Sequence, residues 1–161
     1  DNEDFEMYFD SVEGISPRKK IRLRYYGKPR LNLNNIKLLL EKKYTNFLGR
    51  SKSSKETIKS MEYLKNGILD TRYGICYPRT LVSYLRSYYS INDYRFTLDE
   101  SIKFQKYNSN KIISSSHSIK EIIVEIKTNY TNKIDELKKK FPFTEIRFSK
   151  YCKSIENLFK I

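Results

Sequence analysis

The chain has 161 residues, and its 32 lysines and arginines against 19 aspartates and glutamates give a net charge of +13 at pH 7. This length fits one domain, and 14 tyrosines and 9 phenylalanines with only 5 glycines and 4 prolines exclude a disordered low-complexity chain. Two cysteines and one histidine are too few for a disulfide framework, a thiolate zinc site or a Ser/His/Asp triad.

The apolar stretches are too short to span a bilayer, the longest being Leu38–Leu40 and Ile122–Val124. The N-terminus is acidic and lacks a signal-peptide pattern. We interpret Cys76 and Cys152 as reduced thiols, and His117 as a solvated loop histidine. We therefore expect a cytoplasmic protein, with any membrane association made through other proteins. A metal ion would be held by carboxylates, which favours Mg²⁺ or Mn²⁺.

Five segments alternate between apolar and polar residues with the period of a β-strand. In chain order they are Lys20–Tyr26, Lys37–Tyr44, Leu81–Tyr89, Asp93–Asp99 and Glu121–Lys127. Turn-forming residues at 27–29, 45–49, 91–93 and 107–110 and a serine-rich run at 114–116 separate these segments.

Three segments are predicted to be helical. The first runs from Ser53 to Lys65, because a Ser-x-x-Glu start precedes apolar residues at helical spacing. The second, Thr131–Lys140, ends before Phe141-Pro142, and the third is the amphipathic stretch Lys150–Ile161. The expected fold class is α+β, mainly antiparallel β, with peripheral helices.

The period of two places charged residues on one face of each predicted strand. These sets are Arg22 with Arg24, Glu41 with Lys43, Tyr84 with Arg86, Arg95 with Thr97 and Asp99, and Glu125 with Lys127. For a single strand, the wet face of a sheet explains the pattern. In five strands the pattern favours closure into a β-barrel with a charged interior, which must contain water or a ligand. Such an interior suits a polyanion with a divalent cation.

The segment Lys19–Gly27 resembles the arginine strand of the VTC domain, the polyphosphate polymerase domain of vacuolar transporter chaperone proteins and their bacterial relatives. Two E-x-K elements, Glu41–Lys43 and Glu125–Lys127, resemble the hallmark of the triphosphate tunnel metalloenzymes, the CYTH-like superfamily. Residues 82–86, 94–99 and 148–151 follow in the order of the family. The resemblance implies a single VTC-like tunnel domain over residues 1–161, N-terminally truncated because it lacks the first strand of the family.

The resemblance also implies a role for each matching residue. Four cationic residues would form the catalytic lining of the tunnel: Arg22, Arg24, Lys43 and Arg86. Seven residues would bind phosphate groups: Lys52, Lys55, Tyr84, Arg95, Lys127, Ser149 and Lys150. Glu125 would hold Mn²⁺ or Mg²⁺. For Lys52 and Lys55, a solvated basic loop is the other interpretation.

The implied reaction is metal-dependent transfer of the γ-phosphoryl group of ATP to polyphosphate or pyrophosphate. Two alternatives stay open: a triphosphatase of the same superfamily, and a non-catalytic domain that binds polyphosphate or triphosphate. No nucleic-acid partner is expected, because the tyrosines are spread along the chain and show no RNA-binding sheet signature.

Overall fold

The computed structural model describes residues 1–27, 38–57, 59–108 and 111–161. It has the predicted α+β class, with mainly antiparallel strands and a few helices. The elements are α1 (Glu6–Glu13), β1 (Arg18–Arg24), β2 (Leu38–Asn46), β3 (Gly49–Thr57), α2 (Ser60–Asn66), β4 (Ile68–Asp70), β5 (Gly74–Cys76), β6 (Thr80–Ile91), β7 (Tyr94–Asn108), β8 (Lys111–Ser118), β9 (Ile123–Thr128), α3 (Thr131–Lys140) and α4 (Lys150–Phe159).

The strands β1, β2 and β3 form an antiparallel sheet in that order. Its register places Arg22 opposite Glu41, and Glu41 opposite Ser54. Because directly opposite residues share a face, Arg22, Arg24, Glu41 and Lys43 lie on one side of this sheet, which we call the inner face.

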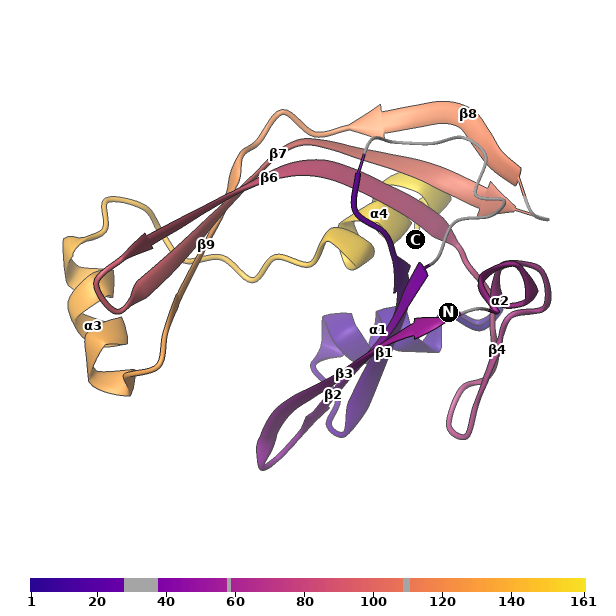
Figure 1. Cartoon of the computed structure of the whole chain (residues 1–161), viewed down its shortest axis with the longest axis horizontal. Coiled ribbons are helices and arrows are strands. Elements are labelled where there is room, and N and C mark those ends of the chain that lie inside the picture. Colours follow the sequence, from indigo (N-terminus) through magenta and orange to yellow (C-terminus); the bar gives the residue numbers. More distant parts are fainter. Residues whose placement is uncertain (28–37, 58, 109–110) are drawn as a thin grey trace.

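A second sheet is built around the long strand β7. One edge of β7 pairs with β6, and the other pairs with β8 near the C-terminal end of β7 and with β9 near its N-terminal end. Figure 1 shows β6 and β7 as a long arch over β1, β2 and β3. The charged face of β6, β7 and β9 is the inner face of this second sheet. Strands β4 and β5 form a separate small hairpin.

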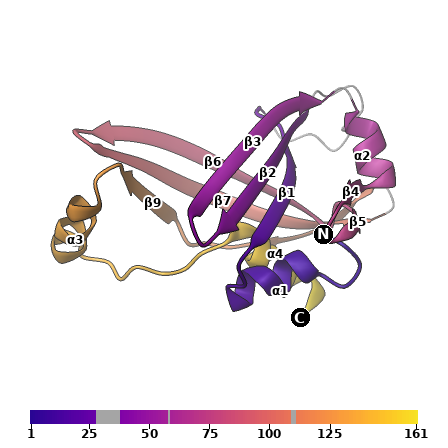
Figure 2. The ribbon, with the colours of Figure 1, turned by 90° about the horizontal axis from the view of Figure 1, so that it is seen from below.

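The helix α1 connects two parts of the core. Met7 packs with Tyr73 and Cys76, whereas Tyr8 packs with Cys152 and Ile155 of α4. Figure 2 shows α1 and α4 close together beside the sheets. The core thereby fixes the N-terminal end of α4 relative to both sheets. No described helix is long and apolar enough to cross a membrane.

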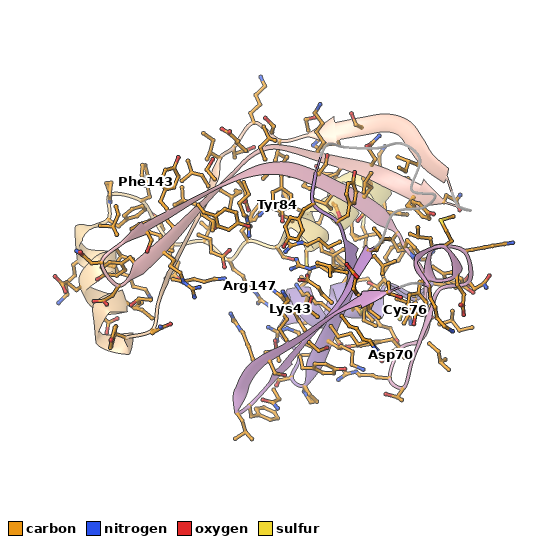
Figure 3. All side chains as sticks on the ribbon, in the orientation of Figure 1. Lys43, Asp70, Cys76, Tyr84, Phe143 and Arg147 are labelled. Carbon is orange, nitrogen blue, oxygen red and sulfur yellow. The ribbon has the colours of Figure 1, made fainter. Side chains whose placement is uncertain are left out.

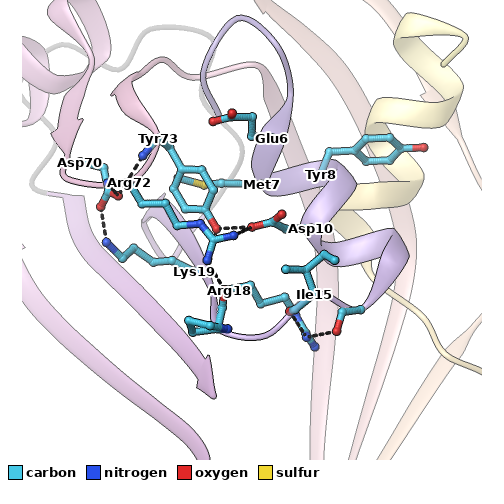
Figure 4. A network of polar contacts seen from close by, with 12 residues as sticks. Glu6, Met7, Tyr8, Asp10, Ile15, Arg18, Lys19, Asp70, Arg72 and Tyr73 are labelled. Carbon is cyan, nitrogen blue, oxygen red and sulfur yellow. Dashed lines mark hydrogen bonds and ion pairs between the residues drawn. The ribbon is translucent and has the colours of Figure 1, made fainter. Parts of the chain in front are cut away.

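A polar network holds β1 from the side opposite to its inner face (Figure 4). Lys19 of β1 pairs with buried Asp70 at an Nζ–Oδ2 distance of 2.5 Å, and Tyr73 Oη donates a 2.7 Å hydrogen bond to Asp10 of α1. Arg72 also pairs with Asp10, at 2.8 Å. Burial and then the bond to Asp10 raise the pKa of Tyr73 to about 12. These contacts join β1 to α1 and to the β4–β5 hairpin.

The five predicted strands and the helices α3 and α4 are confirmed, but the start of the first predicted helix is wrong. Ser53 and Glu56 lie in β3, and the helix begins at Ser60. The capping signal is local, whereas β3 pairs with β2 over nine residues and gains backbone hydrogen bonds along that whole length. The predicted loop around His117 is also wrong, because this exposed residue lies in β8 and its ring stacks against that of Phe104.

Some predictions fall on residues 28–37, 58, 109 and 110, which lie outside the described residues. These are Lys28 and Pro29 of one turn, Lys37 at the start of a strand, Ile58 of the first helix, and part of the turn at 107–110. In the described part of the chain, the hydrogen-bonded pairs leave the two larger sheets open and separate. The closed tunnel therefore stays a prediction.

Candidate functional site

The inner faces of the two larger sheets meet through polar side chains. Arg24 of β1 donates from Nη2 to Tyr84 Oη of β6 over 2.9 Å. Lys43 of β2 interacts electrostatically with Lys127 and Glu125 of β9. Figure 3 labels Lys43 and Tyr84 on the two sheets and shows side chains between the ribbons. The site is therefore assembled from strands far apart in the sequence.

Glu41 is the centre of the first cluster, and its side chain is only 1% exposed. Arg22 Nε and Lys52 Nζ donate hydrogen bonds to its carboxylate, and Arg24 Nη1 lies 3.9 Å from it. Burial alone would raise the pKa of Glu41, but the bonds from Lys52 and Arg22 hold this pKa below its usual value. The ionised carboxylate fixes three cations on the inner face.

Asp99 of β7 is the centre of a second cluster, on the inner face of the second sheet, and its side chain is also 1% exposed. Arg86 binds it through Nε at 2.5 Å and Nη2 at 2.6 Å, and Lys150 Nζ donates to Oδ2. Burial opposes ionisation, but the bonds from Arg86 and Lys150 lower the pKa of Asp99. Arg86 and Lys150 also lie against the ring of Tyr84, at 5.2 and 4.9 Å from its centroid.

Ser149 joins β1 to the N-terminal end of α4. Its Oγ accepts a hydrogen bond from the backbone of Cys152, as a helix cap does, and a 3.1 Å bond from Lys20 Nζ of β1. The positive end of the α4 dipole adds to the basic character of the site. Sequence reasoning missed Lys20, although the period of two already places it on the face of Arg22 and Arg24.

A row of lysines crosses the first sheet, because Lys20 lies opposite Lys43 and Lys43 lies opposite Lys52. Like charges placed directly opposite each other destabilise a sheet. Partial burial, and then the charges of Arg22, Lys127 and Lys52, lower the pKa of Lys43. A bound anion would relieve this repulsion, so the row is suited to phosphate groups.

Of the remaining predicted residues, some lie on the inner face of the second sheet and one lies on the opposite face of the first sheet. Arg95 lies opposite Lys127, and Lys127 forms a 3.0 Å ion pair with Glu125, so these three residues continue the inner face of the second sheet. Lys55 lies opposite Leu40 on the other face of β3, away from Lys52. The alternation of side chains along a strand thus separates Lys55 from the cluster that contains Lys52, and the predicted contact of Lys55 with phosphate stays a prediction.

The carboxylates differ in what they could offer a metal ion. Glu41 and Asp99 are buried and bound by protein cations, whereas Glu125, although paired with Lys127, has 46% of its side chain exposed. In the described ranges, no three His, Cys, Asp or Glu side chains are grouped as metal ligands. A single carboxylate fits Mg²⁺ or Mn²⁺ when phosphate oxygens and water supply the other ligands. Glu125 therefore fits a metal that arrives with a phosphorylated substrate.

Fold and site together define an antiparallel α+β protein in which two buried carboxylates hold cations on the inner faces of the two larger sheets. The family model of the VTC domain matches residues 1–74 and 71–159. The chain thus belongs to the VTC domain family, which is associated with polyphosphate polymerase activity. No curated protein sequence matches the chain at a significant level.

Proposed function

We propose that the chain binds ATP and polyphosphate between its two larger sheets and transfers the γ-phosphoryl group of ATP to the polyphosphate chain. Pyrophosphate would serve as a short acceptor. One observation carries the proposal: two buried carboxylates, Glu41 and Asp99, each hold cations on facing inner surfaces. In this proposal, the two sheets are walls of the tunnel of a triphosphate tunnel metalloenzyme.

The reaction requires no nucleophilic side chain, because a terminal phosphate oxygen of the acceptor attacks the γ-phosphorus. The chain supplies positioning and charge neutralisation, which dominate catalysis of phosphoryl transfer. Arg22 and Arg24 would hold the nucleotide phosphates from one sheet, with Arg86 and Lys150 on the other. The guanidinium groups suit phosphate oxygens because they present several donors in one plane.

The buried carboxylates explain why this site would act efficiently. The cations are already oriented before substrate binds, so they need little reorganisation as charge develops on the transferred group. Glu125 would hold Mg²⁺ or Mn²⁺, and the cation would supply positive charge that neutralises the phosphate groups. Lys43, beside Glu125, would contact the same phosphates.

The test is incubation of the purified chain with ATP and Mn²⁺, with polyphosphate, ADP and free phosphate quantified. We expect the wild type to form polyphosphate and ADP, and the variant Arg22→Ala/Arg24→Ala to form neither. Lys42→Ala is the matched control, since it removes a cation from the opposite face of β2, where Lys42 pairs with Ile21 and Ser53. This control should retain activity.

Other outcomes identify the two alternatives. Free phosphate without polymer would indicate a triphosphatase. Absence of turnover, together with tripolyphosphate binding that the Arg22→Ala/Arg24→Ala variant loses, would indicate a non-catalytic binding domain. Equal polymer formation by the wild type and the double variant would contradict the proposed site.

A further inference from the structure

Tyr26 is an exposed aromatic residue attached to the candidate site. It follows the C-terminal end of β1 and is 68% exposed. Arg24 Nη1 donates a 2.9 Å hydrogen bond to Tyr26 Oη, and the guanidinium carbon lies 5.3 Å from the centroid of the ring. The hydroxyl group is thus anchored by a residue of the site, while much of the ring surface is accessible.

The position of Tyr26 follows from the order of residues along β1. Lys20, Arg22 and Arg24 share the inner face, and successive residues of one face are about 6.6–6.8 Å apart along a strand. Lys20 lies opposite Lys43, on the side of the site that also contains Glu125. Tyr26 lies beyond Arg24, at the other end of this row.

We propose that Tyr26 stacks on the base of the nucleoside triphosphate, so that the nucleotide enters at the Tyr26 end with its phosphates directed along Arg24 and Arg22 toward Lys43. This inference rests on the proposed function and adds the nucleoside to the phosphate site. Every nucleobase presents a π-face to an aromatic ring, and an adjacent guanidinium group strengthens such contacts. The site would therefore distinguish a nucleotide from an inorganic triphosphate.

Tyr88 is the competing aromatic residue, since it is 67% exposed on the inner face of β6. It lies opposite Thr97, and Thr97 lies opposite Glu125. Tyr88 therefore belongs to the row of the carboxylate proposed to hold the metal, beside the reacting phosphates. A base at Tyr88 would place the nucleoside where the terminal phosphate is needed, which favours Tyr26.

The test compares two ligands, a non-hydrolysable β,γ-imido analogue of ATP and inorganic tripolyphosphate, by isothermal titration calorimetry at one salt concentration. For Tyr26→Ala we expect Kd for the ATP analogue to rise about tenfold, and Kd for tripolyphosphate to change by less than about twofold. Tyr26→Phe keeps the ring and should keep most of the preference for nucleotide. Tyr89→Ala is the control, because Tyr89 is also exposed but lies on the outer face of β6.

Several results would overturn the inference. Equal losses of affinity for the ATP analogue and for tripolyphosphate in Tyr26→Ala would mean that Tyr26 acts only by supporting Arg24. The base would not stack on Tyr26 if Tyr26→Ala left Kd for the ATP analogue unchanged, or if Tyr26→Phe and Tyr26→Ala raised it equally. It would not stack there either if Tyr88→Ala lost the preference for nucleotide. If the wild type bound neither ligand, the proposed function itself would fail, and the inference with it.

Discussion

The substitution Glu41→Gln tests whether a buried carboxylate holds the cations of the site. It preserves the size of the side chain and removes its charge. Removing one partner of a buried ion pair costs about 3–5 kcal/mol of unfolding free energy. Arg22 and Lys52 are 42% and 44% exposed and regain water, whereas Arg24 is only 17% exposed. We therefore expect a loss of about 2–3 kcal/mol, below the full cost of a buried pair.

Urea unfolding followed by circular dichroism measures this loss, as a lower midpoint with an unchanged slope. For a chain of this size it corresponds to a decrease in Tm of roughly 4–12 °C. Glu125→Gln is the matched control, because Glu125 belongs to the other E-x-K element and forms an exposed ion pair. We expect this control to lose less than about 1 kcal/mol.

Unfolding in the presence of tripolyphosphate shows whether Glu41→Gln is unstable because its cations lack a countercharge or because the fold is damaged in general. If unpaired cations cause the instability of Glu41→Gln, an added polyanion supplies their missing countercharge, and the difference from the wild type should narrow. Equal stability of the Glu41→Gln and Glu125→Gln variants would refute the reasoning. A difference that tripolyphosphate leaves unchanged would do so as well.

Three further predictions follow from the pKa shifts and one glycine. The pKa values of Glu41 and Asp99 are lowered by folding, so their contribution to stability is present above about pH 4 and is lost as pH falls through the folded-state values. The wild type should then lose stability on acidification more steeply than Glu41→Gln in urea titrations, and parallel curves would contradict this. The pKa of Lys43 is lowered in the free protein, so binding of the tripolyphosphate anion should raise this pKa. Calorimetry in two alkaline buffers should then detect proton uptake on binding, and Lys43→Ala should reduce that uptake. Gly67 has a φ of 77°, and a Cβ there would lie 2.8 Å from Ile75 Cγ2. Gly67→Ala should therefore lose about 1–3 kcal/mol of unfolding free energy, measured by urea unfolding. Gly74→Ala should lose less, because its Cβ would meet nothing within 4 Å.

The sequence by itself determined five of the strand segments and the face of each on which its charged residues lie. This was possible because alternation of side chains is a local property of an extended backbone. Arg22 with Arg24, and Arg86 with Tyr84, could be assigned to shared faces before any pairing was known. The family could also be identified from motifs in their order, and the family match confirms that resemblance.

Only the tertiary structure decided which charges meet. The pairs Arg22–Glu41 and Arg86–Asp99 depend on strand register, and Lys150–Asp99 depends on the packing of α4 against β6 and β7. A sequence period contains no information on register between strands, because it repeats identically along each strand. The separation of Lys55 from Lys52 had the same cause. Both lysines were expected to reach the phosphate chain, with a solvated basic loop as the other interpretation, and pairing with β2 makes their segment a strand whose side chains alternate between two faces. The residue types of the site could therefore be predicted from single strands, whereas its geometry depends on contacts between strands far apart in the sequence.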